Sequence, residues 1–85
     1  MSLFRYLFPR KSQVTIGSMW VIDTDYDNPF ERKIVYKVDD VKSNWVKYTC
    51  YGRAGFITTD SRNIKDFYAF YRKLDKAPDN ISFRD

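Results

Sequence analysis

Three aspartates at alternate positions are the first residues whose spacing suggests a chemical site. Asp23, Asp25 and Asp27 match the opening of a calcium-binding loop, in which alternate carboxylates ligate the ion. Such a loop also needs a bend at its sixth position and a bidentate glutamate at its twelfth, and these positions hold Asn28 and Ile34. Isoleucine cannot ligate a cation, so we expect a solvated loop and no metal site. A weak divalent-cation site is the alternative.

The remaining residues offer few groups that could form a catalytic site. Asp39 and Asp40 are adjacent, and neighbours on a strand point to opposite faces of the sheet, so their carboxylates do not converge on one substrate. The chain has no histidine and one cysteine, Cys50, which excludes histidine-activated nucleophiles and an internal disulfide. We therefore expect no enzyme and no cofactor. An enzyme reading would need a metal-dependent activity that Asp25→Ala abolishes.

Basic and aromatic residues interleave along a predicted hairpin over residues 34–51. Positive charge suits a phosphate backbone, and exposed rings suit unstacked bases. Trp, Tyr and Arg also anchor protein interfaces, so a protein partner explains the same pattern. We predict a binding surface on the outward face of this hairpin, and nucleic acid and protein both remain open as its ligand. The predicted binding residues are Lys33, Lys37, Trp45, Lys47, Tyr51 and Arg53.

The register of this hairpin follows from its alternating pattern. A two-residue turn at Ser43-Asn44 would put the charges of Lys37 and Asp39 on the face of Tyr48 and Cys50, which a buried face does not tolerate. We therefore expect a three-residue loop over residues 42–44, with Asn44 in the left-handed conformation that such loops require. The expected cross-strand pairs are Val38 with Tyr48, Tyr36 with Cys50, Asp39 with Lys47, and Val35 with Tyr51.

Composition and charge limit the remaining possibilities. The chain has 85 residues, enough for one small domain, and it is 44% hydrophobic and 31% charged. Its seven Tyr, seven Phe and two Trp exceed what one small core holds, so some rings must lie at a surface or in an interface, self-association included. The net charge is +4, with four acids and no bases across residues 23–31, which makes the molecule bipolar.

The coarse pattern predicts a mainly β domain with one helix. Residues 14–23, 34–41, 45–51 and 56–59 have the features of strands, and Gly52 and Gly55 bracket a turn. Asp60 or Ser61 is expected to cap a helix. Its apolar stripe consists of Ile64, Phe67, Tyr68, Tyr71 and Leu74. This arrangement favours an α+β fold: a small SH3-like, strongly bent antiparallel barrel of four to five strands with a C-terminal α-helix.

The ends of the chain are expected to lie outside this domain. Residues 1–12 contain a short helical pattern at Leu3–Phe8, which docks on the domain or on a neighbour, or anchors weakly at a membrane surface. Residues 13–75 form the domain, and residues 76–85 are expected to be a flexible tail. Neither a secretory signal nor a membrane span is recognisable, so we expect a cytoplasmic protein.

Several short motifs resemble those of a group of small phage and prophage proteins. They are Gly17-Ser-Met-Trp20, Asn28-Pro-Phe30, the hairpin that ends Trp45-Val-Lys-Tyr48, and a terminal helix that contains Phe67 and Tyr71. The resemblance covers about residues 17–74, and Asn44 stands where the group usually has glycine. It implies an SH3-like viral accessory protein with no assigned chemistry. A host protein in the host cytoplasm, such as a defence or nucleic-acid-processing factor, is the partner that this setting favours.

Overall fold

The computed structural model describes residues 13–28 and 33–85. The chain forms β1 (Met19–Ile22), the helical turn α2 (Asp23–Tyr26), β2 (Val35–Lys42), β3 (Trp45–Gly52), β4 (Gly55–Asn63), α3 (Ile64–Phe70) and β5 (Tyr71–Lys73). The expected helical pattern at Leu3–Phe8 and the Asn28-Pro-Phe30 motif beyond Asn28 lie outside the described residues.

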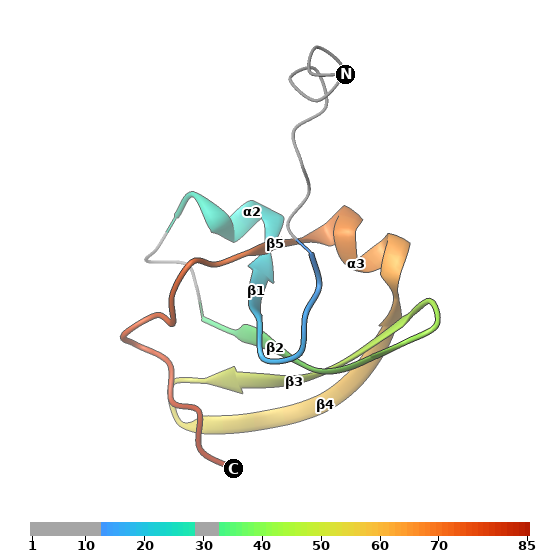
Figure 1. Ribbon diagram of the computed structural model, residues 1–85. Helices are drawn as coiled ribbons and strands as arrows, with labels where there is room; N and C mark the ends of the chain where they lie inside the picture. The colour runs from blue at the N-terminus through green and yellow to red at the C-terminus, as the bar shows by residue number, and fades with distance from the viewer. Residues whose placement is uncertain (1–12, 29–32) are drawn as a thin grey trace.

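All five strands belong to one antiparallel sheet with the order β4-β3-β2-β1-β5 (Figure 1). The sheet bends strongly, and α3 connects one edge strand to the other. Because β4 and β5 are not paired with each other, the sheet remains open. The prediction of a mainly β domain with a C-terminal helix is therefore confirmed, whereas a closed barrel is not observed.

The β2–β3 hairpin has the expected pairs in its base but a different loop. Val38 pairs with Tyr48 and Tyr36 with Cys50, and Val35 pairs with Tyr51, as predicted. Lys42 pairs with Trp45, so the loop has two residues rather than three. Ser43, with a φ of 54°, takes the left-handed conformation that was expected at Asn44.

A bulge at Asp39 allows the two-residue loop to form while Val38 and Tyr48 stay on the predicted core face. The register skips Asp39, so that Asp40, and not Asp39 as predicted, pairs with Lys47. One extra residue in a strand moves every later side chain to the opposite face. The bulge thereby keeps Val38 and Val41 on the same face, where Val41 pairs with Val46 and packs against the core.

Strand β4 is longer than predicted, and the helix that follows it is shorter. β4 pairs with β3 along its length, from Gly55 opposite Gly52 to Asn63 opposite Trp45. The predicted cap at Asp60 or Ser61 is therefore wrong: Asn63 is the N-cap, and its Oδ1 accepts a 2.9 Å hydrogen bond from the Lys65 N–H. Cross-strand pairing with β3 has overridden the local capping signals.

Three of the five residues of the predicted apolar stripe are buried, Ile64 and Tyr68 are partly buried, and the stripe continues beyond the helix. Phe67, Tyr71 and Leu74 are buried, yet the helix ends at Phe70. Tyr71 begins β5, which pairs with β1 through the partners Tyr71 and Ile22 and through Arg72 and Val21. The helical spacing therefore identified three core residues, but it placed Tyr71 and Leu74 in the helix, and Leu74 packs in the cluster on the opposite face of the sheet from Phe67 and Tyr71.

Two clusters of buried residues lie on opposite faces of the sheet. The larger one, under α3, contains Trp20, Val38, Val46, Tyr48, Cys50, Phe67 and Tyr71. The smaller one contains Val21, Val35, Tyr51, Leu74 and Ile81. Neighbouring residues such as Cys50 and Tyr51 contribute to different clusters because successive side chains of a strand point to opposite faces.

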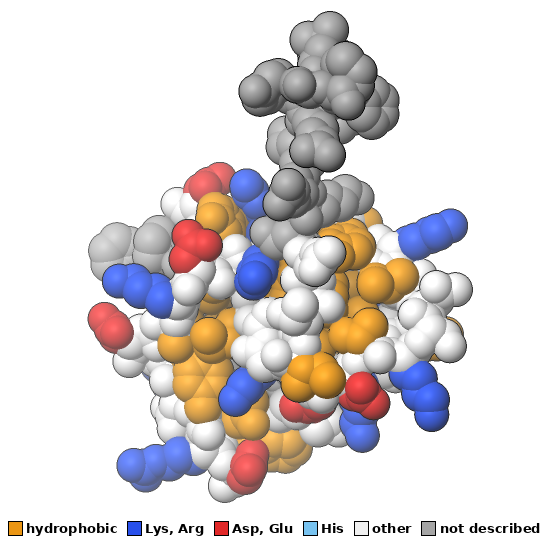
Figure 2. Space-filling model, viewed as in Figure 1, with side chains coloured by type: hydrophobic (Ala, Val, Ile, Leu, Met, Phe, Trp, Pro, Cys, Tyr) orange, Lys and Arg blue, Asp and Glu red, His pale blue; other side chains and the backbone are white. Residues whose placement is uncertain are grey.

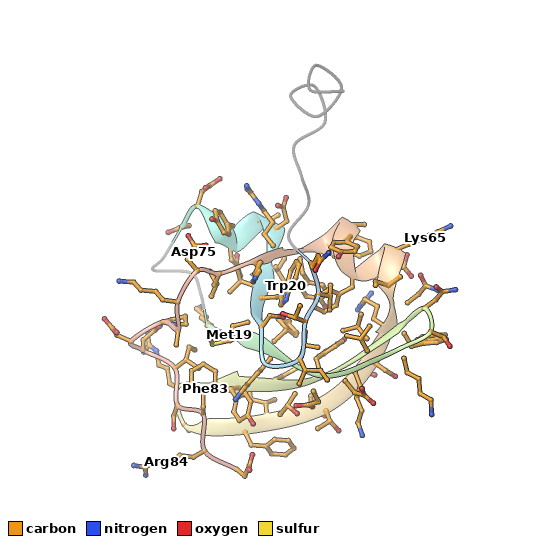
Figure 3. The ribbon with its side chains drawn as sticks, viewed as in Figure 1. Met19, Trp20, Lys65, Asp75, Phe83 and Arg84 are labelled. Carbon is orange, nitrogen blue, oxygen red and sulfur yellow. The ribbon has the colours of Figure 1, made fainter. Side chains whose placement is uncertain are left out.

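The C-terminal segment, expected to be a flexible tail, covers the smaller cluster. Ser82 donates its backbone N–H to the Gly52 carbonyl at 2.9 Å, and Phe56 donates to the Arg84 carbonyl at 2.7 Å. The Phe83 ring lies 5.2 Å from that of Tyr51. In Figure 3, Phe83 lies against the sheet and Arg84 extends from the domain. This segment therefore contributes to the core of the domain.

Candidate hairpin interface

Four of the six predicted binding residues share one face of the sheet. Trp45, Lys47 and Tyr51 alternate along β3 with the buried Val46, Tyr48 and Cys50. Lys37 joins them from β2, since it pairs with Thr49 on the same face. The alternation that suggested this face is therefore present in the structure.

Tyr51 is placed on this face but is not an exposed ring. Its side chain is only 8% exposed because Ile81 and Phe83 pack against it. Its hydroxyl donates a 3.2 Å hydrogen bond to the Asp85 carboxylate. Lys37, half-buried, lies with its Nζ 5.9 Å from the centre of the Phe83 ring. These two predicted contact residues are partly or wholly covered by the C-terminal segment.

Trp45 is the exposed ring of this face. It is 55% exposed at the start of β3, between its cross-strand partners Lys42 and Asn63. Two residues further along, Lys47 lies between Asp40 and Ser61. We call this surface the hairpin face, and it consists of Asp40, Lys42, Trp45, Lys47, Ser61 and Asn63.

Lys33 and Arg53 lie at the other end of β3. Arg53 is exposed in the turn after Gly52, and the Lys33 carbonyl oxygen is 3.6 Å from the position that a Cβ on Gly52 would take. Strand geometry separates Gly52 from Trp45 by about 23 Å. The six predicted residues therefore form three groups: Trp45 and Lys47 are exposed on the hairpin face, Lys37 and Tyr51 lie on the same side of the sheet under the C-terminal segment, and Lys33 and Arg53 lie at the far end of β3.

The hairpin face carries charges of both signs. Asp40 lies beside Lys47, and Asp39 accepts a hydrogen bond from the Thr49 hydroxyl in the middle of the same side of the sheet. Figure 2 shows that Lys and Arg side chains also lie near Asp side chains on the side of the molecule that it displays. A phosphate backbone is attracted by net positive charge, which this arrangement reduces.

Four residues of this face were not among the predicted binding residues. Asp40 and Lys42 reach it only through the bulge at Asp39, and Ser61 and Asn63 reach it because β4 extends to residue 63. Residues 59, 61 and 63 alternate with 60 and 62 as in a strand, and this alternation could have predicted that they lie opposite Thr49, Lys47 and Trp45. The helix-capping residues in the same stretch obscured it.

The opposite face of β4 holds a guanidinium within an aromatic cluster. The Arg62 side chain lies over the rings of Phe70 and Tyr71, with its Cζ 5.7 and 5.6 Å from their centres. Burial first, and then the neighbouring tyrosines, raise the pKa of Tyr71 well above its usual range. The pKa of Arg62 is also raised, chiefly by a hydrogen bond with Tyr48. This cluster joins β4 to β5 through side chains.

Asp23 and Asp27, from the acidic stretch, lie beside Arg72 of β5. The carboxylate of Asp23 lies 3.4 Å from Arg72 Nε, and that of Asp27 lies 4.0 Å from Arg72 Nη1. The Arg72 guanidinium also lies 4.1 Å from the centre of the Tyr26 ring.

Residues 13–28 and 33–85 contain no cluster of three or more potential metal ligands. In the same residues no helix is long and apolar enough to cross a bilayer.

The fold and the site together define a small, mainly β domain with an exposed tryptophan on a regular strand. Comparison of the chain with protein-family models, curated proteins and solved structures found no significant match.

Proposed function

We propose that this chain is a non-enzymatic binding module that holds a protein partner through the hairpin face, with Trp45 as the central anchor. One observation carries the proposal: Trp45 is 55% exposed, whereas Trp20 is 2% exposed and fully integrated in the core. Tryptophan is the residue type most enriched at the centres of protein interfaces, and this one lies on a strand beside charged neighbours.

The surroundings of Trp45 favour a protein over a nucleic acid. Lys42 and Lys47 supply positive charge beside the ring, and Asp40 supplies negative charge on the same face. A mixed rim of this kind orients a protein partner, while the acidic groups repel phosphates. The burial of Tyr51 also removes one of the two rings on which a nucleic-acid surface depended.

The resemblance to phage and prophage proteins bears on the setting of the proposal. An SH3-like description suits a meander of four strands whose fifth strand returns to pair with the first. With that resemblance, the proposed partner is a host protein in the cytoplasm of an infected or lysogenic cell.

Photo-crosslinking at position 45 tests the proposal. Benzoyl-phenylalanine replaces Trp45, and the purified domain is irradiated in host lysate with an excess of unlabelled wild-type or Trp45→Ala protein as competitor. We expect a protein adduct that the wild-type competitor removes and Trp45→Ala does not. Equal competition by both, or the absence of any adduct, contradicts the proposal.

Anisotropy with labelled single- and double-stranded DNA and RNA examines the alternative. Direct nucleic-acid binding loses affinity steeply between about 50 and 200 mM salt because counterions are released. We expect no binding at the lower salt concentration. Micromolar binding that falls with salt and requires Lys47 would replace the protein partner by a nucleic acid.

A further inference from the structure

The outer edge of β4 is a long strand edge with little cover. β4 has 9 residues and pairs with β3 on one side only. Beyond β3, its described backbone partner is the Arg84 carbonyl, which accepts from the Phe56 N–H near the start of the strand. Residues 56–61 are exposed. Figure 1 shows β4 as the outermost band of the sheet. An edge of this kind is a template for another strand.

Two short side chains cap this edge locally. Asp60 Oδ1 accepts a 2.8 Å hydrogen bond from the Ser61 N–H, and the Thr58 hydroxyl donates a 3.3 Å hydrogen bond to the Thr59 carbonyl. In an antiparallel strand the N–H and C=O of one residue point to the same side, and this side alternates along the chain. Residues 59 and 61 therefore direct their backbone groups outward, where an incoming strand can replace the side-chain caps.

We propose that this edge pairs antiparallel with the same edge of a second copy, around a two-fold axis at Ser61. A bulge at Ile57 limits the regular part of β4 to residues 58–63. Near the middle of this part, two antiparallel registers keep residues of the same sheet face opposite each other. In one, Asp60 faces Asp60 of the second copy, and in the other Ser61 faces Ser61 of the second copy. The first sets Asp60 against Asp60 of the second copy, and like charges directly opposite are destabilising.

The register centred on Ser61 sets Asp60 of each copy opposite Arg62 of the other. The Ser61 N–H then donates to the Ser61 carbonyl of the second copy, which releases the Asp60 carboxylate on the face of the sheet where the Arg62 guanidinium lies over Phe70 and Tyr71. The ion pairs found between described residues involve Arg72 and not Arg62. Because the same short segment supplies both halves of the contact, it is self-complementary, as a two-fold interface requires.

The predicted dimer is weak and depends on concentration. Pairing over residues 59–63 buries less area than a stable dimer does, so we expect a monomer–dimer equilibrium. The backbone edge of β4 makes this contact, whereas the proposed function rests on the exposed side chain of Trp45 on β3, so the two are tested separately: dimerisation by protein mass, and partner binding by crosslinking at position 45.

Sedimentation equilibrium over about a hundredfold range of protein concentration tests this interface. We expect the mean mass of the wild-type chain to rise from one chain toward two. Ser61→Pro removes the outward N–H without removing a β3 pairing bond, and proline is tolerated on edge strands. This variant should stay monomeric. Ser61→Ala keeps the N–H and should associate as the wild type does.

A charge reversal gives a second readout that does not depend on proline. Asp60→Arg sets two arginines against each other across the axis, and should raise the dimer dissociation constant about tenfold. Circular dichroism checks that each variant remains folded. A wild-type chain that stays monomeric overturns the inference. So does a folded Ser61→Pro or Asp60→Arg variant that dimerises as tightly as the wild type.

Discussion

Thr49 donates its hydroxyl hydrogen to the carboxylate of Asp39, the extra residue of the β2 bulge. Thr49 is 6% exposed, one of two buried polar residues of the described chain. The hydrogen bond joins the two central strands at the position where the register changes. It therefore stabilises the register that places Lys42 beside Trp45.

Thr49→Val should destabilise the domain through this contact. Valine has a similar shape but cannot donate, so a loss of about 1 kcal/mol in the free energy of unfolding is expected. Urea unfolding followed by circular dichroism measures it. Thr59→Val, at the exposed partner of Thr49 on β4, is the matched control and should change the stability by less than about 0.5 kcal/mol. Equal effects at the two positions would argue against a role for the Asp39 contact.

The two tryptophans should differ sharply in their effect on stability. Trp20 donates from its Nε1 to Ser18 Oγ at 2.9 Å, and its ring lies 5.0 Å from that of Phe67. Trp20→Ala should cost about 3–5 kcal/mol. Trp45→Ala should leave the melting temperature within a few degrees. Thermal unfolding compares them, and a large loss for Trp45→Ala would mean that this ring packs in the folded domain.

Gly55 is the glycine at which a side chain should be least tolerated. Its φ is +114°, and a Cβ there would lie 2.8 Å from the Arg84 carbonyl oxygen. Gly55→Ala should both strain the turn and displace the C-terminal segment from Tyr51. We expect a loss of more than about 2 kcal/mol.

Gly17→Ala separates the two causes. Gly17 also has a positive φ of +88°, but a Cβ there meets nothing within 4 Å. It should therefore show the backbone strain alone, about 1 kcal/mol. If the two substitutions had the same effect on urea unfolding, the contact with Arg84 would contribute nothing.

The pH dependence of stability should reveal Cys50. Burial, together with the negative charge of Asp60, raises the pKa of the Cys50 thiol to about 11. An unfolded thiol ionises near pH 8.5, so between these values the unfolded chain binds fewer protons. Below about pH 8.5 the Cys50 thiol is protonated in both states and leaves the free energy of unfolding unchanged. Above it the unfolded thiol ionises first, so the free energy of unfolding falls, by about 2 kcal/mol at pH 10.

Urea midpoints measured from neutral to alkaline pH check this prediction, with Cys50→Ala as the control. The variant should have a flatter profile over the lower part of this range, before the tyrosines ionise. A thiol reagent should label native Cys50 only as fast as the domain opens. Rapid labelling of the folded chain would show that the thiol is accessible.

Local alternation was enough to find the faces of the hairpin. Val46, Tyr48 and Cys50 alternate with polar residues, and the three pairs at the base of the hairpin follow from this alternation. The bulge at Asp39 could not be read in the same way. A three-residue loop and a two-residue loop with a bulge give the same faces for Val38 and Tyr48, so the pattern does not distinguish them.

The class of the domain, the core face of β3 and the exposure of Trp45 follow from local alternation, because each depends on residues a few positions apart. The tertiary structure decided where β4 ends, since pairing with β3 competes with helix capping at Asp60 and Ser61. It also decided that Tyr51 is buried, because Ile81 and Phe83, some thirty residues away in the chain, cover it. Long-range burial of this kind leaves no periodic signal in the residues that become covered.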